Sequence, residues 1–414
     1  MAHWSEFSTG QRIKILRCKV KLSQAALAEK SGLTVRVLRS AEQDDRLSLP
    51  TLLALAAALP QPVSVILGEQ EPHQSFSRRD MVMLRNLGPA VHDTAAGSLD
   101  STVEPLSQEE LRRIVDHAWT LYWRGQYGEV GVIATRLIRA AAVGLHDLPD
   151  GSRAPGWGTL SDSYRLAAYV ANLWGLRDLA YAAIGHAGLA AERAADPLRG
   201  ALVDSGRSWV MLRDARLPEA LALAEKAAVD IEPGVGTATT EDMVVYGSHV
   251  NFAAVVASRM GNKERAADFL SQSHATGQRM GQESTAHGTL FGPVTATTQA
   301  VGINVSLGHT AKALSLMNSV HDVSSLQEAA QHRFQMDKAL TLVEAGMYDD
   351  ALDTIEAAVT AAPHWASHQS LPAVIVEKVS HTHSTLKRLR RVSSIIGTPA
   401  IQGGFAQASL KTAL

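Results

Sequence analysis

Apolar residues recur every three to four positions along residues 8–60, which predicts short amphipathic helices joined by tight turns. Ser and Thr stand where such helices would begin, because their side chains accept hydrogen bonds from the first turn, and Gly stands where one would end. We therefore expect four helices here: from Ser8 or Thr9 to before Leu22, from Ser23 to Gly32, from Thr34 to about Gln43, and from Leu49 to Leu59, with Pro60 and Pro62 beyond.

The third of these helices has two different faces. Leu38 and Ala41 fall on an apolar face that suits a core. The opposite face carries polar side chains, namely Arg36, Arg39, Ser40 and Gln43. Two short helices joined by a Gly-containing turn, the second exposing Arg and Gln, predict a helix-turn-helix that reads DNA.

From about residue 108 onward the chain has the pattern of helices almost throughout, and one signal recurs in it. A Gly, once replaced by Ala, precedes an Ala, once replaced by Val, by five positions. Since Gly permits a tight turn and Ala permits close packing, each pair predicts two antiparallel helices. The pairs are Gly125/Val130, Gly175/Ala180, Ala215/Ala220, Gly261/Ala266, Gly308/Ala313 and Gly346/Ala351. We expect a solenoid of about six helical hairpins, with loops at Gly144–Leu160 and Ile231–Glu241.

This pattern resembles the tetratricopeptide repeat, most clearly in the sixth copy, where Gly346, Tyr348, Ala351, Ala358 and Pro363 fall as that repeat prefers. Successive turn residues are 50, 40, 46, 47 and 38 positions apart. The family's period is about 34 residues, so we expect longer helices or loops here. The resemblance implies a right-handed α-solenoid whose first helices line a concave, ligand-binding face.

By the same resemblance, counting back from each turn residue gives the side chains expected to be exposed on the concave face. Amides among them could hold a peptide backbone, because they both donate and accept hydrogen bonds. The alternative is that the aromatic residues pack between repeats and the amides are only solvated. The candidates are Trp119, Tyr122, Tyr169, Asn172, Trp209, Arg213, Asn251, Gln299, Arg333 and Asp337.

Composition supports an all-α fold, because only 5% of the 414 residues are aromatic and Ala and Leu are abundant. The net charge of −2 hides an uneven distribution. Residues 10–40 contain eight Lys or Arg and one Glu, a local charge of +7. Such a patch suits DNA phosphates, although a solvated helix face would have the same composition.

The stretch from Leu22 to Thr34, LSQAALAEKSGLT, followed by Glu42 and a Leu/Ala run at 51–59, resembles the Cro/C1-type (XRE family) DNA-binding domain over about residues 8–68. The resemblance implies a five-helix, lambda-repressor-like domain bound to double-stranded DNA. Arg and Gln can pair with base edges, whereas Ser23 and Thr34 suit phosphates. The expected DNA-binding residues are Ser23, Gln24, Thr34, Val35, Arg36, Arg39, Ser40 and Gln43.

The segment after Glu42 departs from that family. Gln43-Asp44-Asp45-Arg46 stands where the family usually has Gly and basic residues. Asp44 and Asp45 would repel phosphates that came close to them. A degenerate domain that binds protein instead of DNA is therefore the alternative.

The sequence carries none of the common nucleotide-binding, zinc-protease or serine-hydrolase motifs, so we expect no enzyme, no cofactor and no metal site. Its single cysteine, Cys18, cannot form a disulfide within the chain. No window is long and apolar enough to span a membrane, and we expect a cytoplasmic protein.

These patterns predict a domain order. Residues 1–70 form the helix-turn-helix domain, 71–106 a linker with a connecting helix around Ser77–Leu87, 107–365 the repeats, and 366–414 a C-terminal capping helix and tail.

A DNA-binding head followed by such repeats resembles the RRNPP family of signal-responsive bacterial regulators. That resemblance implies a homodimeric transcription factor used in quorum sensing, whose repeat domain binds a short signalling peptide. Two alternatives remain at this point: a regulator that senses a small diffusible molecule, and a protein-interaction adaptor with a degenerate head.

Overall fold

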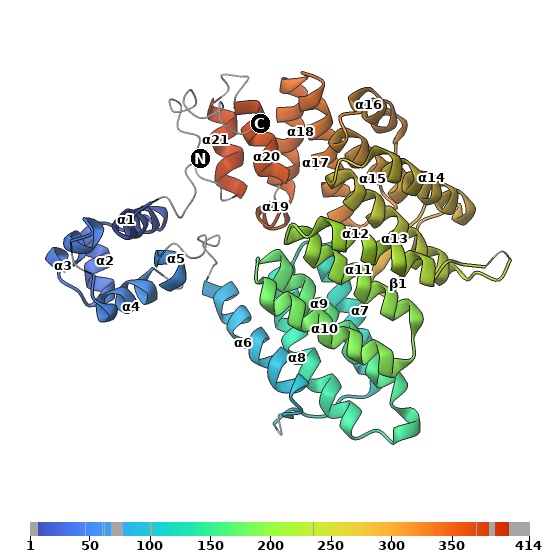
Figure 1. The fold of residues 1–414 in the computed structure, drawn as a ribbon, viewed down its shortest axis with the longest axis horizontal. Helices are drawn as coiled ribbons and strands as arrows, with labels where there is room; N and C mark the ends of the chain where they lie inside the picture. Colours follow the sequence, from blue (N-terminus) through green and yellow to red (C-terminus); the bar gives the residue numbers. More distant parts are fainter. Residues whose placement is uncertain are drawn as a thin grey trace. The chain divides into compact units, whose positions relative to one another are not determined.

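The computed structural model describes residues 7–396 except residues 46, 60, 62, 68–77, 100–101, 235, 370 and 381–385. Within this part the chain is α-helical apart from one short 3-10 turn and one two-stranded hairpin (Figure 1). The expected all-α class is confirmed, with the hairpin as an addition. The chain divides after Arg78 into two compact units. We call the first the head and the second, from Arg79, the repeat unit.

The head consists of five short helices around one apolar core, as expected. Ile13, Leu27, Leu38, Leu55 and Ile66, one from each helix, have no exposed surface and pack in one cluster. The helices are α1 (Thr9–Lys19), α2 (Gln24–Ser31), α3 (Val35–Glu42), α4 (Leu49–Ala58) and α5 (Val63–Leu67).

The helix ends in the head follow from capping residues. Ser23 and Thr34 accept hydrogen bonds from backbone N–H groups in the first turns of α2 and α3. Gly32 ends α2 with a left-handed φ of 68°, which costs Gly little because it has no Cβ. Ser8, one of the two caps expected for α1, accepts a hydrogen bond from the Gln11 N–H. These caps fix the turn between α2 and α3.

The repeat unit begins with α6 (Arg78–Ala95), which packs on the first hairpin where Met83 lies against Gly131. Six hairpins of antiparallel helices follow, as the sequence predicts. They are α7 (Gln108–Trp123) with α8 (Tyr127–His146), α9 (Ala154–Leu173) with α10 (Arg177–Ala194), α11 (Pro197–Arg213) with α12 (Leu217–Asp230), α13 (Thr240–Arg259) with α14 (Lys263–Met280), α15 (Pro293–Ser306) with α16 (Thr310–Ser319), and α17 (Glu328–Glu344) with α18 (Tyr348–Ala361).

All six predicted turn residues have the left-handed conformation. Their φ angles lie between 58° at Ala215 and 77° at Gly175 and Gly346. The small residue five positions later, from Val130 to Ala351, is fully buried in every hairpin. The recurring pair therefore marks a left-handed turn followed by a close helix contact.

One expected loop is partly helical. The stretch Gly144–Leu160 contains the end of α8, a 3-10 turn at Asp150–Ser152 and the first residues of α9. Pro155 stands in the first turn of α9, where a missing N–H costs nothing. Gly156 then allows the side chains of Leu145 and Leu148 to approach the helix closely.

The sequence did not predict the β-hairpin between α14 and α15. Strands β1 (Ser284–Ala286) and β2 (Thr289–Phe291) pair antiparallel, with Ala286 opposite Thr289. The two turn residues, His287 and Gly288, have φ angles of 46° and 76°, as a type I′ turn requires. We call these two residues the hairpin tip.

The last helices are α19 (Pro363–Ser367), α20 (Leu371–Ser380) and α21 (Leu386–Ile396), and they pack on the sixth hairpin. Arg388 of α21 forms ion pairs with Asp353 and Glu356 of α18. Arg388 and Arg391 of α21 therefore pair with acidic residues of the same unit. No helix among the described residues combines the length and apolar character needed to cross a bilayer.

Candidate nucleic-acid interface and inner repeat face

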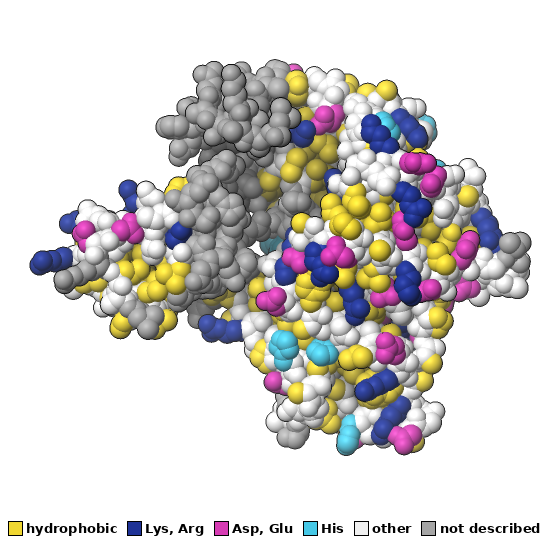
Figure 2. Space-filling view, viewed as in Figure 1, with side chains coloured by type: hydrophobic (Ala, Val, Ile, Leu, Met, Phe, Trp, Pro, Cys, Tyr) yellow, Lys and Arg dark blue, Asp and Glu magenta, His cyan; other side chains and the backbone are white. Residues whose placement is uncertain are grey.

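The outer face of α3 carries most of the side chains that the sequence assigns to DNA. Arg36, Arg39 and Gln43 are exposed, while Leu38 and Ala41 are buried in the core. Lys and Arg side chains stand out on the head at α3 in the space-filling view (Figure 2). The remaining candidates lie at the same turn: Ser23 and Thr34 are exposed, and Gln24, Val35 and Ser40 are half-buried.

A hydrogen-bonded network below this face holds Gln24 and Arg39. Glu42, at the end of α3, accepts hydrogen bonds from Arg17 Nε at 2.6 Å and from Gln24 Nε2 at 2.7 Å. Gln24 Oε1 in turn accepts from Arg39 Nε at 3.3 Å. Three helices thus meet at one carboxylate, and two candidate base-reading side chains are preorganised by it.

Glu42 stays ionised although its side chain is only 4% exposed. Burial alone would raise the pKa of its carboxyl group. The hydrogen bonds from Arg17 and Gln24 outweigh that effect, so the pKa of Glu42 lies below its usual value. The hydrogen bond to Glu42 likewise raises the pKa of Arg17.

Two of the eight basic residues in the predicted patch have structural roles. Arg17 pairs with Glu42, and the guanidinium of Arg12 donates to the backbone oxygens of Ile66 and Leu67 at 3.3 and 2.7 Å. Exposed cationic side chains remain at Lys14, Lys21, Lys30, Arg36 and Arg39. Fewer cationic side chains are therefore available to a partner than the sequence count suggests, and two of them, Arg36 and Arg39, lie on α3.

The sequence suggested that the carboxylate of Asp44 is free to repel phosphates, but in the structure it is hydrogen-bonded within the head. Its carboxylate accepts hydrogen bonds from the Gly10 N–H at 2.6 Å and from the Ser8 hydroxyl, both at the start of α1. A carboxylate at a helix N-terminus is stabilised by the helix dipole. The negative charge of Asp44 is therefore partly compensated by the N-terminus of α1, which weakens its repulsion of DNA.

Comparisons with known proteins agree with this geometry. Residues 13–66 match the family model described as Helix-turn-helix. The immunity repressor protein of Bacillus phage phi105 is 34% identical over 116 residues, covering 26% of this chain and 81% of the repressor. The chain belongs to the helix-turn-helix family of DNA-binding regulators. The relative is a repressor, in agreement with the expectation of a regulator and not an enzyme.

A solved structure, the apo form of the competence regulator ComR from Streptococcus vestibularis, is similar to 80% of this chain and 97% of its own, with 12% identity. The TM-score is 0.31. A likeness at that level does not establish a shared architecture.

In the repeat unit of this helix-turn-helix regulator, none of the ten predicted concave-face residues is fully exposed to solvent. The expectation of exposure is therefore wrong. Trp119, Asn172, Asn251 and Asp337 are buried; Tyr122, Tyr169, Trp209, Arg213, Gln299 and Arg333 are half-buried.

The first physical reason is an aromatic cluster. Trp119 and Tyr122 of α7, Tyr169 of α9 and Trp209 of α11 contact one another with ring centroids 5.1–5.8 Å apart. Burial raises the pKa of Tyr122 well above its usual value. The structure therefore brings these four candidates together, but they pack against one another between α7, α9 and α11, the first helices of the first three hairpins.

The second reason is that the β-hairpin occupies the inner face. Trp123 Nε1 donates to Gly288 O at 2.9 Å, and a guanidinium N–H of Arg165 donates to His287 O. Gly288 lies so close to the ring of Trp119 that a Cβ there would overlap it. The hairpin tip therefore covers residues that an open groove would expose.

The remaining candidates lie on α9 and on later helices, and several of them have partners within the unit. Asn172 Oδ1 accepts from Arg177, whereas its Nδ2 has no hydrogen-bond partner among the described residues, and Asn251 Oδ1 accepts from Ser273 Oγ at 3.2 Å. Arg333 and Asp337 form an ion pair on α17 at 3.1 Å. Gln299 lies half-buried on α15.

Contacts between the first and last hairpins also narrow the inner face. Arg124, after α7, pairs with Glu328 of α17 at 3.7 Å. Gly125 lies against the Cβ of Trp365 in α19. Sequence reasoning missed these contacts and the hairpin tip, for which the one available signal was the His-Gly pair between two short runs rich in Thr and apolar residues.

Proposed function

We propose that the chain is a transcriptional regulator that binds operator DNA as a homodimer, acts in the cytoplasm and responds to a signalling ligand held by the repeat unit. In this proposal α3 enters the major groove. Arg36, Arg39, Gln24 and Gln43 read base edges, Ser23, Thr34 and Ser40 hold phosphates, and Val35 makes apolar contact.

The observation that carries the DNA-binding part is the arrangement of Gln24 and Arg39. Gln24 donates to the buried carboxylate of Glu42, and Arg39 donates to Gln24. Both lie in a head that matches the helix-turn-helix family. Side chains held in place lose less freedom on binding, which favours specific readout.

The ligand-sensing part is supported by Arg213. This guanidinium is half-buried beside the Trp209 ring, 5.9 Å from its centroid, and has no ion pair with any described carboxylate. Burial lowers its pKa, and the neighbouring charge of Arg177 adds to that effect. A cation kept in such surroundings costs stability, and ligand sites are where such groups concentrate.

Of the two ligand classes, a short peptide remains the first proposal, while a small diffusible molecule gains support from the hairpin that narrows the inner face. An adaptor without DNA binding is the weaker alternative, since residues 13–66 of the head match the helix-turn-helix family model.

The decisive experiment is selection of random duplex DNA by the purified full-length protein at two salt concentrations. We expect an enriched inverted repeat, bound with a mass corresponding to two chains per site. Arg36→Ala with Arg39→Ala should weaken operator binding about 30-fold or more, because each bidentate base contact contributes about 1–3 kcal/mol. Arg279→Ala with Lys312→Ala removes the same charge from exposed positions of the repeat unit and should leave affinity unchanged. Equal affinity of both double variants would refute the interface.

A further inference from the structure

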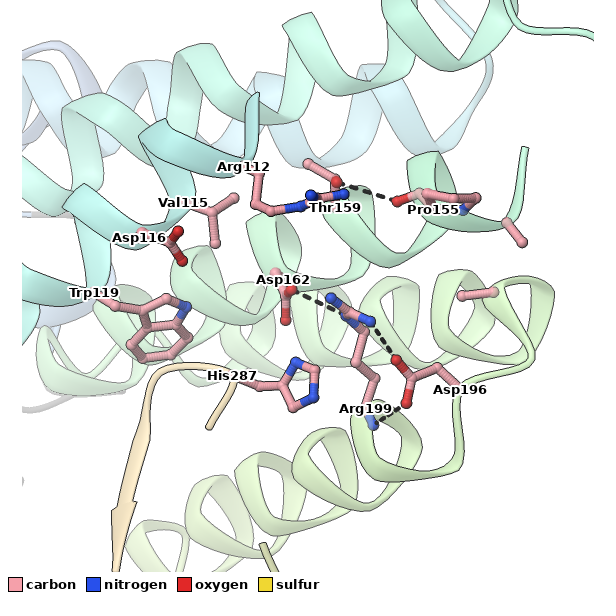
Figure 3. A pocket seen from close by; sticks show the side chains of 12 residues that line it. Arg112, Val115, Asp116, Trp119, Pro155, Thr159, Asp162, Asp196, Arg199 and His287 are labelled. Atoms are coloured by element: carbon pink, nitrogen blue, oxygen red, sulfur yellow. Dashed lines mark hydrogen bonds and ion pairs between the residues drawn. The ribbon is translucent and has the colours of Figure 1, made fainter. Parts of the chain in front are cut away.

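A cavity of about 500 Å³ lies on the inner side of the first three hairpins (Figure 3). One face of α7 contributes Arg112, Asp116 and Trp119, spaced four and three residues apart, so that all three point the same way. Helix α9 forms the facing wall, the start of α11 closes one side, and His287 of the hairpin tip closes another.

Two of the three carboxylates that line this cavity, Asp162 and Asp196, already have partners. Asp162 accepts from Arg165 at 3.2 Å and from Arg199 at 3.0 Å, one through each oxygen. Asp196 accepts from the backbone N–H of Arg199 at 3.1 Å and also from its guanidinium. Figure 3 shows Arg199 between the two acids. A ligand in the interior therefore meets a neutralised cluster.

The groups without partners are mainly donors. Trp119 is 5% exposed, and its Nε1–H has no hydrogen-bond partner among the described residues. Burying an unpaired N–H is unfavourable, so the indole is satisfied only if a molecule in the cavity brings an acceptor. Arg112, exposed at the mouth, forms no ion pair with any carboxylate of the described chain. Asp116 beside it is exposed too and can accept one N–H.

We propose that this cavity binds an α-amino carboxylate: its carboxylate accepts from Trp119 Nε1–H and from Arg112, and its N–H group donates to Asp116. This inference rests on the proposed ligand-sensing function and names the chemistry of the ligand. Two sources share that chemistry, the C-terminal residue of a short peptide and a free amino acid. Because His287 belongs to the hairpin tip, an occupant of the cavity also contacts the segment that covers the inner face.

The test follows the indole N–H signals of full-length protein labelled with ¹⁵N at its seven tryptophans. Trp119→Phe, which removes the donor and keeps an aromatic ring, identifies the Trp119 signal. The probes are a random pentapeptide pool with free C-termini, the same pool with amidated C-termini, and the twenty free amino acids. We expect the Trp119 signal to move downfield with free carboxylate probes and to stay in place with the amidated pool.

Variants then test the donors. Trp119→Phe and Arg112→Ala should each weaken binding of the active probe at least tenfold. Trp365→Phe, a buried tryptophan in α19, and Arg113→Ala, the next residue along α7, are matched controls expected to change affinity less than twofold. Because Arg112 is exposed, its variant retains the fold even if Trp119→Phe does not.

A response to the peptide pool alone identifies a peptide terminus, and a response to amino acids alone identifies a free metabolite; both support the site. No movement of the Trp119 signal with any carboxylate at millimolar concentration, or unchanged affinity in Arg112→Ala, overturns it. DNA selection fails or succeeds independently of these signals. A protein that selects an operator but shows no change of the Trp119 signal therefore disproves this inference and leaves the proposed DNA binding intact.

Discussion

The head and the repeat unit place their charged side chains in opposite ways. In the head, the buried charge is paired, Glu42 with Arg17, while the cationic side chains of α3 face outward. In the repeat unit, Arg213 is half-buried without an ion pair to any described carboxylate, and the Trp119 Nε1–H at the cavity has no hydrogen-bond partner among the described residues. In the proposed function, this difference matches a head that meets DNA from outside and a repeat unit that takes a small ligand into its interior.

The strongest test of this comparison removes the paired charge of the head. Glu42→Ala leaves Arg17 with its hydrogen bond to Leu22 O but without an anionic partner, and breaking a buried ion pair costs about 3–5 kcal/mol. We expect faster amide hydrogen exchange in α1–α3, with exchange in α7–α18 unchanged, as measured by mass spectrometry. Glu29→Ala, at an exposed position of α2, is the control. Equal protection in Glu42→Ala and wild type would mean that the network does not stabilise the head.

The corresponding test for the repeat unit is Gly288→Ala. The substitution places a Cβ against the Trp119 ring at a residue with φ of 76°, so both overlap and backbone strain oppose it. Overpacking typically costs about 1–3 kcal/mol, and we expect the hairpin tip to lose protection together with α7. Gly185→Ala in α10, where a Cβ meets open space, should instead stabilise the unit slightly. Unchanged exchange at residues 284–291 would contradict docking of the tip.

A smaller effect separates turn conformation from packing. At Gly175 a Cβ would meet no neighbour, so Gly175→Ala costs only the left-handed φ of 77°, about 1 kcal/mol. Ala215 already bears this strain, so Ala215→Gly should relieve it and raise the free energy of unfolding by at most about 1 kcal/mol. Chemical denaturation of both variants checks the prediction. A loss at Gly175 equal to that at Gly288 would show that turns, not the hairpin, dominate the unit.

The smallest effect is on pH dependence. Because the pKa of Glu42 is lower in the folded head than its ordinary value of 4.5, its stabilisation is complete above that pH and is lost as pH falls through the folded pKa. Wild type should therefore lose more stability than Glu42→Gln between pH 6 and pH 3. The difference is measured by denaturation at each pH, monitored by amide hydrogen exchange in peptides from the head. Parallel stability curves for the two proteins would contradict the prediction.

Sequence predicts the two units unequally, for a physical reason. Contacts that define the head are local, so caps such as Ser23 and Gly32 and the outward Arg36 follow from periodicity. The same holds for the turn pairs of the repeats. The inner face was mispredicted because its exposure depends on contacts such as Trp123 with Gly288. The roles of Arg17 and Glu42 were also missed, since a charge count does not show which charges pair.

The bond from Trp123 to the hairpin tip joins residues 165 positions apart. During translation at about 5–20 residues per second, α7 to α9 emerge many seconds before Gly288. Until then the cavity lacks the wall formed by His287. Long-range contacts of this kind form late and slow the final folding step. In the proposed function, ligand recognition therefore depends on completion of the chain: a truncated or nascent protein with an intact head would carry the proposed DNA-binding side chains without the means to respond to a signal.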